Sequence, residues 1–175
     1  MNKKKRGIVI FLFSVFLCFC IALTANFFIT QHKRERYLYM RMFFEELNTA
    51  SLLLSNLAED STLSMVKLDS LINLQWSLNR IGDTLEVGYS FVDKSIPIIA
   101  DWWFDSSAST LSNYIYAPQL LPDNFDLTEY LQELHCTLNT LKESLSDKEN
   151  LNLNPDLTLE EFSQIIYDFY VFHSS

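Results

Sequence analysis

Residues 7–30, GIVIFLFSVFLCFCIALTANFFIT, form a nearly continuous apolar stretch without a single charged side chain. At about 1.5 Å per residue, an α-helix of this length spans about 36 Å and exceeds the roughly 30 Å hydrocarbon core of a bilayer. Because lipid offers no partners to backbone N–H and C=O groups, a lone segment in a membrane must be helical. We therefore predict one transmembrane helix at 7–30.

A short basic tail, residues 1–6, precedes this stretch. Secretory signal peptides also begin with basic residues, but their apolar core is about 7–15 residues long and ends at a small-residue cleavage site. Residues 22–25 read Ala-Leu-Thr-Ala, which is a poor match to the favoured Ala-x-Ala. We expect a retained signal anchor. The alternative is cleavage near Thr24 or Ala25, which would release a secreted body.

Basic residues flank the apolar stretch on both sides, so the excess of Lys and Arg that marks a cytoplasmic flank is nearly balanced. The compact tail favours a cytoplasmic N-terminus with the body, 31–175, outside the membrane; the opposite orientation is the rival. Basic and aromatic residues beside a membrane helix are expected at the level of the lipid head groups. The residues predicted at this interface are Lys3, Lys4, Lys5, Arg6, Lys33, Arg34, Arg36, Tyr37 and Tyr39.

The body is strongly acidic. All 22 Asp and Glu residues follow residue 30, whereas four of the 13 Lys and Arg residues precede residue 7, so 31–175 has nine bases against 22 acids and a net charge of −13. Nucleic-acid binding needs Lys and Arg to neutralise phosphates, so we exclude a nucleic-acid partner. The bulk of the body would also be repelled by anionic lipid.

Apolar residues in the body recur at alternating steps of three and four, which is the period of an α-helix. Such stripes must be buried against facing helices. We predict an all-α protein, in which the transmembrane helix is followed by an antiparallel bundle of four to five helices in a single domain. No Pro or Gly interrupts 8–59, so the first body helix is expected to continue from the membrane helix. The stripes cover 37–58, 62–93, 126–146 and 158–172.

Local signals mark where these helices bend and begin. Gly82 and Gly88 lie inside a helical stripe, where each costs about 1 kcal/mol relative to Ala, so they indicate close helix contact or a bend near residue 88. Asp126 has the character of an N-cap, and Thr158 with Glu161 fits a capping box.

The richest aromatic stretch is 89–104, YSFVDKSIPIIADWWF. Adjacent Trp side chains point about 100° apart on a helix, so one core face does not easily take both. One interpretation packs one Trp inside and places the other at the end of the bundle. The sharper interpretation is an exposed patch for a protein partner or for the membrane interface, because Trp is enriched in binding hot spots. The predicted partner-binding residues are Ile96, Ile98, Ile99, Trp102, Trp103 and Phe104.

No sequence motif for catalysis stands out. The chain has no HExxH, no Gly-rich phosphate loop and no GxSxG, and the adjacent His135 and Cys136 point to different faces of a helix. Cys136 is expected to be a buried, inert thiol. Residues 150–161 space oxygen-bearing side chains as an EF-hand loop does, but Pro155 replaces the usual Gly, so we favour an Asn-rich turn. We predict no enzyme, no cofactor and no metal.

The function that these patterns favour is binding. We expect a membrane-anchored helical-bundle accessory protein that binds a protein partner at the cell envelope. The alternative is a ligand-sensing helical bundle that acts through a partner membrane protein. Homo-oligomerisation through an unsatisfied heptad stripe is a further possibility.

Overall fold

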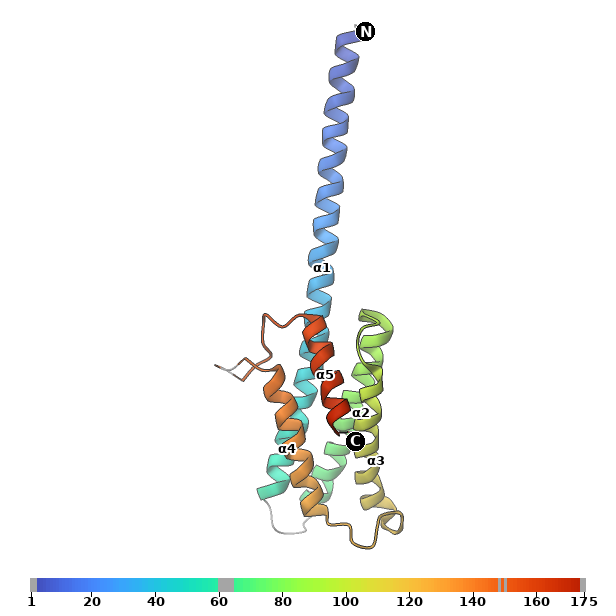
Figure 1. Ribbon diagram of the computed structural model, residues 1–175, viewed down its shortest axis with the longest axis vertical. Helices are drawn as coiled ribbons and strands as arrows, with labels where there is room; N and C mark the ends of the chain where they lie inside the picture. Colours follow the sequence, from blue (N-terminus) through green and yellow to red (C-terminus); the bar gives the residue numbers. More distant parts are fainter. Residues whose placement is uncertain (1–2, 60–64, 148, 150, 174–175) are drawn as a thin grey trace. The chain divides into compact units, whose positions relative to one another are not determined.

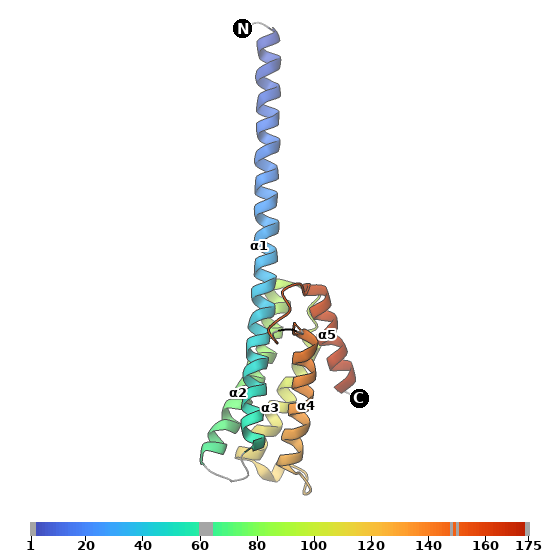
Figure 2. The ribbon, with the colours of Figure 1, turned by 90° about the vertical axis from the view of Figure 1, so that its left-hand side faces the viewer.

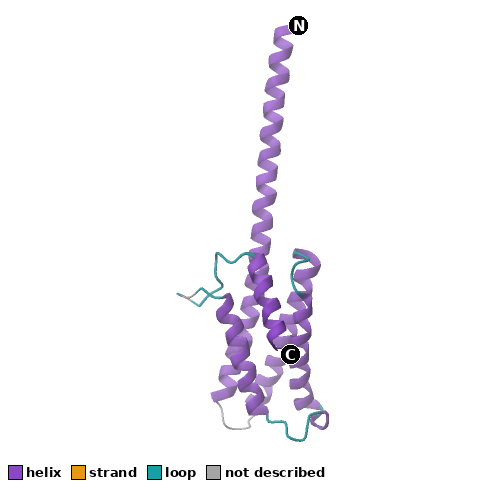
Figure 3. Cartoon of the chain, viewed as in Figure 1, coloured by secondary structure: helices purple, strands orange, loops and turns teal. Residues whose placement is uncertain are grey.

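The computed structural model describes residues 3–59, 65–147, 149 and 151–173. Within these ranges the chain is helical and contains no β-strand, and its one isolated β-bridge pairs Ser146 with Leu153 (Figure 3). The prediction of an all-helical protein is confirmed for the described residues. By contacts, the chain divides into two compact units, Met1–Tyr37 and Leu38–Ser175.

Five α-helices occur in the described ranges, and short helical turns join some of them. A π-helical turn, Gly88–Val92, follows α2; a 3₁₀ turn, Ile98–Ala100, leads into α3; and a second 3₁₀ turn, Pro118–Leu120, follows α3. The helices are α1 (Lys3–Glu59), α2 (Met65–Val87), α3 (Asp101–Tyr116), α4 (Leu127–Leu145) and α5 (Leu159–His173) (Figure 1).

The first unit consists of the apolar part of α1. Its side chains from residue 11 to residue 30 are exposed apart from Cys20, which is partly exposed, and they include large hydrophobic residues such as Phe13 and Phe16. The hydroxyl of Thr24 donates to the carbonyl of Cys20 at 3.0 Å, and Thr30 donates to Asn26 at 2.8 Å. These polar side chains are therefore satisfied within their own helix, as a surrounding of lipid would require.

The second unit is built on the predicted apolar stripes. On the residue 38–59 part of α1, the residues of the stripe are each at most 4% exposed, and the matching positions on α2, α4 and α5 supply most of the remaining core. α2 lies beside α3, and α4 lies beside α5 (Figures 1 and 2). The stripe of α1 comprises Met40, Phe43, Leu47, Ala50, Leu54 and Leu57.

Aromatic rings fill the centre of this core. The Phe43 ring meets the Phe104 ring of α3 at 6.2 Å and the Phe162 ring of α5 at 5.2 Å, both edge to face. Phe104 stacks on Phe169 of α5 at 5.8 Å. Such aromatic pairs contribute about 0.5–1.5 kcal/mol each beyond their buried area. They connect α1, α3 and α5 within the second unit.

The helix starts follow the predicted capping chemistry. The Asp126 carboxylate accepts hydrogen bonds from the backbone N–H groups of Thr128 at 2.7 Å and Glu129 at 3.2 Å. At the start of α5, Glu161 accepts from the backbone N–H of Thr158 at 2.9 Å, and Thr158 Oγ1 accepts from the Glu161 N–H at 3.2 Å. Both signals are confirmed, and the capping box of Thr158 and Glu161 lies at the start of α5.

Gly82 of α2 and Gly88 of the π-helical turn lie where another chain segment comes close. A Cβ atom at Gly88 would overlap the ring of Tyr39, and a Cβ atom at Gly82 would overlap the carboxylate of Asp101. The α-helix ends at Val87 and continues as the π-helical turn from Gly88 to Val92. Close contact and a change of helix geometry at residue 88 therefore both occur.

Replacing Gly88 by Ala is expected to lower the free energy of unfolding by about 2 kcal/mol, the usual range for overpacking a core. The added methyl group meets a Tyr39 ring that is 5% exposed and is held edge to face by Phe162 at 5.8 Å. Urea unfolding of the full chain in detergent, followed by circular dichroism, measures the loss.

Gly82→Ala is the matched control on the same helix. Its methyl group meets only the ends of the Asp101 and Asp105 side chains, which can rotate away, so the gain in helix propensity of up to about 1 kcal/mol is retained. We expect Gly82→Ala to leave the stability unchanged or raised. Equal losses for the two variants would contradict the proposed contact between Gly88 and Tyr39.

Candidate interaction surface

The aromatic stretch before and within α3 is split between the core and the surface. Trp102 is 64% exposed and Ile99 is 51% exposed, with Ile98 beside them at 38%. Ile98 and Ile99 precede Trp102 by four and three positions, so both lie near Trp102 at the start of the helix. We call Ile98, Ile99 and Trp102 the α3 patch.

Three of the six predicted partner-binding residues are wholly or partly withdrawn from this surface. Ile96 is 1% exposed and Phe104 is 0% exposed, so both belong to the core and cannot contact a partner. α3 begins at Asp101, and this register turns Phe104 inward, on the same face as Ala108 and Leu111. Ile96 and Phe104 therefore lie outside the exposed part of the aromatic stretch.

Trp103 occupies an intermediate position and links α3 to the end of α5. Its ring meets Phe169 edge to face at 4.9 Å and lies 6.2 Å from the ring of His173. Burial lowers the pKa of His173, and the nearby charge of Glu133 opposes this effect. One Trp of the pair thus packs against the core, while Trp102 points into solvent.

A second apolar surface lies between α4 and α5, where a groove of about 340 Å³ opens to solvent. Its apolar lining comes from Leu141 of α4 and from Ile165, Phe169 and Phe172 of α5, and its polar lining from Thr140, Ser144, Asp168 and His173. We call these eight residues the α4–α5 groove.

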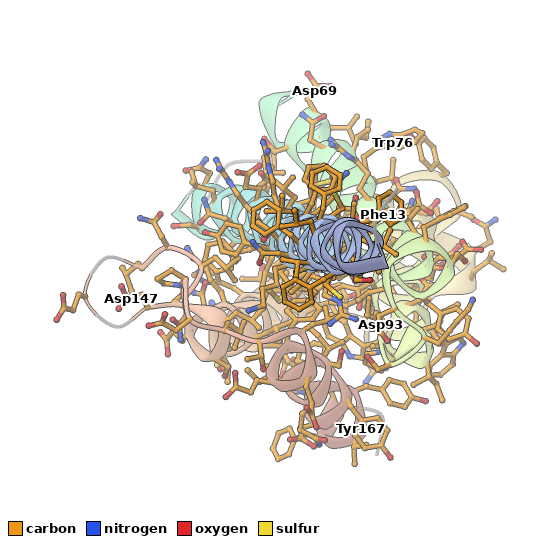
Figure 4. The ribbon with its side chains drawn as sticks, turned by 90° about the horizontal axis from the view of Figure 1, so that it is seen from above. Phe13, Asp69, Trp76, Asp93, Asp147 and Tyr167 are labelled. Carbon is orange, nitrogen blue, oxygen red and sulfur yellow. The ribbon has the colours of Figure 1, made fainter. Side chains whose placement is uncertain are left out.

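Sequence reasoning missed this groove, although α5 carried a signal for it. The core stripe of α5 ends at Phe169, whereas Tyr167, Val171 and Phe172 are large residues that lie off the stripe. They are 49%, 47% and 79% exposed, and Tyr167 projects outward from α5 (Figure 4). Apolar residues on the outer face of an otherwise amphipathic helix indicate a surface that something else covers.

The surroundings of both surfaces are acidic. Partial burial, together with the neighbouring charges of Asp105, Glu86 and Asp83, raises the pKa of Asp101 to about 6. Near the groove, Asp168 accepts a hydrogen bond from Gln164 Nε2 at 2.7 Å. Both surfaces therefore combine exposed apolar side chains with negative charge.

The residues predicted at the lipid head groups fall into three groups. Lys33, Arg34 and Tyr37 are exposed on α1, and Arg36 is partly exposed. The tail residues Lys3, Lys4, Lys5 and Arg6 lie in the first turns of α1, and their side chains are outside the described part of the structure.

Tyr39 is the exception, because its ring lies in the core of the second unit and its hydroxyl is buried without a hydrogen-bond partner among the described residues. Burial raises the pKa of this hydroxyl. The Tyr39 ring therefore differs from the other predicted interface residues, since it is buried and not exposed on α1. The inward face of α1 is wider than the predicted stripe and includes Tyr39 and Phe44.

Neither the cysteine of the body nor the 150–161 segment forms a site. Cys136 is exposed on α4 and not buried, because it lies two positions from the stripe residues Leu134 and Leu138 and so faces away from the core. Asn150 lies outside the described residues. Across the described ranges, no three His, Cys, Asp or Glu side chains come together in a group that could hold a metal ion.

The fold and these surfaces define an all-helical protein with one long apolar N-terminal helix. Comparison of the chain with models of protein families, with curated proteins and with solved structures finds no match.

Proposed function

We propose that this protein is a membrane-anchored helical bundle that binds a protein partner at the cell envelope. The α3 patch carries this proposal. Leaving Trp102 and Ile99 in water forgoes about 1.5–3 kcal/mol of burial for each aliphatic or aromatic side chain of this size. Trp is the residue most enriched in binding hot spots, and aliphatic neighbours on the same face complete the pattern of an anchor cluster.

The anchor is supported by length, hydropathy and internal hydrogen bonding. Among the described helices, α1 alone is long and apolar enough to cross a bilayer, with a mean hydropathy of 2.3. The basic tail then holds the N-terminus in the cytoplasm and the acidic body outside. Cleavage of the apolar segment and release of the body is the rival arrangement.

The α3 patch differs from the surface around the other highly exposed Trp, Trp76 of α2, which has fewer aliphatic neighbours. Trp76 on the outer side of α2 is as exposed as Trp102, at 62%, and points away from its helix (Figure 4). Of the four residues one turn away from Trp76, Asn73, Asn79 and Arg80 are polar, and Ile72, which is partly exposed, is the only aliphatic one. Single exposed hydrophobic residues are normal on soluble surfaces, whereas a cluster marks an interaction site.

Site-specific photocrosslinking tests the proposal. A photoreactive phenylalanine analogue is placed at position 99 or 102 of the full chain in its native membrane, and position 76 serves as the control. We expect one discrete protein adduct from 99 and from 102 and none from 76. An adduct pattern that is the same at all three positions, or no adduct at 99 and 102, would overturn the proposal.

A further inference from the structure

The α4–α5 groove has an apolar lining that water covers poorly. Phe172 at its edge is 79% exposed, and the lining continues inward through Ile165 and Leu141 to the core ring of Phe169. Burying a Phe side chain from such exposure gains about 1.5–3 kcal/mol. The occupant must therefore present an apolar face to this groove.

The length and walls of the groove suit a helix. Its α5 wall extends from Ile165 to Phe172, which is about 10 Å or two turns, and its α4 wall covers the turn from Thr140 to Ser144. A channel between two helices accepts the side-chain ridge of a third helix. An amphipathic helix can place apolar residues at i, i+3 or i+4, and i+7 into a groove of this length.

The negative charge around the groove indicates which kind of helix would bind there. Residues 126–175 contain ten acidic residues and two basic ones, Lys142 and Lys148, which gives a net charge of −8. Three ion pairs lie on α1 and α2, among them those between Arg41 and Glu45 at 2.7 Å and between Arg80 and Glu46 at 2.5 Å. Within the described ranges, no Lys or Arg forms an ion pair with Asp168 of α5 or Glu133 of α4.

Two of these carboxylates are placed to act on an occupant. Asp168 lines the groove, and Glu133 on α4 is close enough to the groove residue His173 to influence its pKa. A helix with Lys or Arg beside its apolar face would pair with both. A second copy of this chain, an anionic lipid surface or a nucleic acid would each bring further negative charge to the groove and be repelled.

We propose that the α4–α5 groove binds a basic amphipathic helix of the partner protein. This inference rests on the proposed function as a binding module and adds the chemistry of the partner. The apolar side of that helix contacts Phe172, Ile165 and Leu141, and its flanking Lys or Arg residues face Asp168 and Glu133. The groove is separate from the α3 patch, so the two surfaces can be tested independently.

A defined peptide serves as the probe because the natural partner is not identified. The probe is a fluorescent peptide of about 18 residues, long enough for helix formation, with Leu at helical spacing and Lys elsewhere. Two matched peptides replace every Lys by Glu or scramble the Leu positions without changing the composition. The full chain is held in nanodiscs of phosphatidylcholine, which adds no anionic surface, and empty nanodiscs provide the background. Fluorescence anisotropy gives the dissociation constant.

We expect the Leu/Lys peptide to bind the full chain and the Leu/Glu and scrambled peptides to bind at least about tenfold more weakly, because they lack the charge or the apolar face. Phe172→Ala should weaken binding about tenfold, a typical loss for a hot-spot aromatic residue. Phe91→Ala is the matched control, since Phe91 is 84% exposed but lies in the turn after α2, outside the groove. It should change binding by less than about twofold.

The charge contribution is tested by the double variant Asp168→Asn/Glu133→Gln. This variant should weaken the binding of the Leu/Lys peptide about threefold or more. It should also lose less affinity than the wild-type chain when the salt concentration is raised from about 50 to about 300 mM. Equal binding of the scrambled peptide, equal effects of Phe172→Ala and Phe91→Ala, or no binding would each overturn the groove proposal. If photocrosslinks at 99 and 102 persist in that case, the proposed function stands and only the partner chemistry fails.

Discussion

Replacing Phe104 by Ala is expected to lower the free energy of unfolding of the second unit by about 3–5 kcal/mol, the range for truncating a buried Phe. The Phe104 side chain is fully buried and contacts the rings of Phe43, Phe169 and Trp103. Its removal leaves a cavity where three helices meet. Because domains are stable by only about 5–15 kcal/mol, a large part of the folded population is at risk.

The neighbouring residue provides the control. Trp102 is larger than Phe104 but is 64% exposed, and no ring contact of its indole occurs among the described residues. Trp102→Ala is expected to change the free energy of unfolding by less than about 0.5 kcal/mol. Urea unfolding followed by circular dichroism compares the two variants, and near-ultraviolet circular dichroism reports the loss of aromatic packing. Similar losses for both variants would mean that α3 begins in another register.

The helices were predictable from the sequence because their apolar stripes are long and regular. The stripe residues predicted on 126–146 include Leu131, Leu134, Leu138, Leu141 and Leu145, and each of them is at most 3% exposed. Such a stripe fixes which face of the helix points into the core, since rotating the helix about its axis would expose five leucines together. The starts of α4 and α5 were predictable for a similarly local reason, because their caps lie within three residues.

The division of the aromatic stretch between core and surface was not predictable in the same way. Between Gly88 and Ala100 the chain passes through a π-helical turn and a 3₁₀ turn. Each changes the angle per residue, so the phase of the α2 stripe cannot be extended into α3. The side that Trp102 or Phe104 takes depends on the contacts of Phe104 with α1 and α5, which are distant in sequence.

The groove and the burial of Tyr39 share a different cause. Both depend on how many other helices pack against a given helix. The apolar periodicity of that helix does not predict this number. α1 packs against rings from both α3 and α5, so Tyr39 is covered by Phe162. At the end of α5 no other described helix covers Phe172. Its side chain is therefore exposed, although the sequence of α5 resembles that of a core helix. The unpartnered face is visible only when all five helices are in place.

Placing two arginines in the apolar segment is expected to abolish stable membrane integration. Leu17 and Ile21 lie one helical turn apart near the middle of 7–30. An Arg at the centre of a transmembrane helix costs about 2.5–3.5 kcal/mol on insertion scales, so Leu17→Arg/Ile21→Arg together cost about 6 kcal/mol. The wild-type chain should stay in the membrane pellet after alkaline carbonate extraction, and the double variant should move to the supernatant.

The matched control, Leu17→Ala/Ile21→Ala, removes the same side chains without adding charge and should stay in the pellet.

The orientation can be read in the same membranes from Cys136, which is exposed on α4, whereas Cys18 and Cys20 lie within the apolar segment. A membrane-impermeant maleimide should label Cys136 in intact cells, and a Cys136→Ser variant should not be labelled. The segment would be a cleaved signal if alkaline carbonate released the wild-type chain from the pellet. A mass that corresponds to a chain starting beyond residue 24 would show the same. Labelling only after permeabilisation would instead reverse the orientation, because the acidic body would then face the cytoplasm.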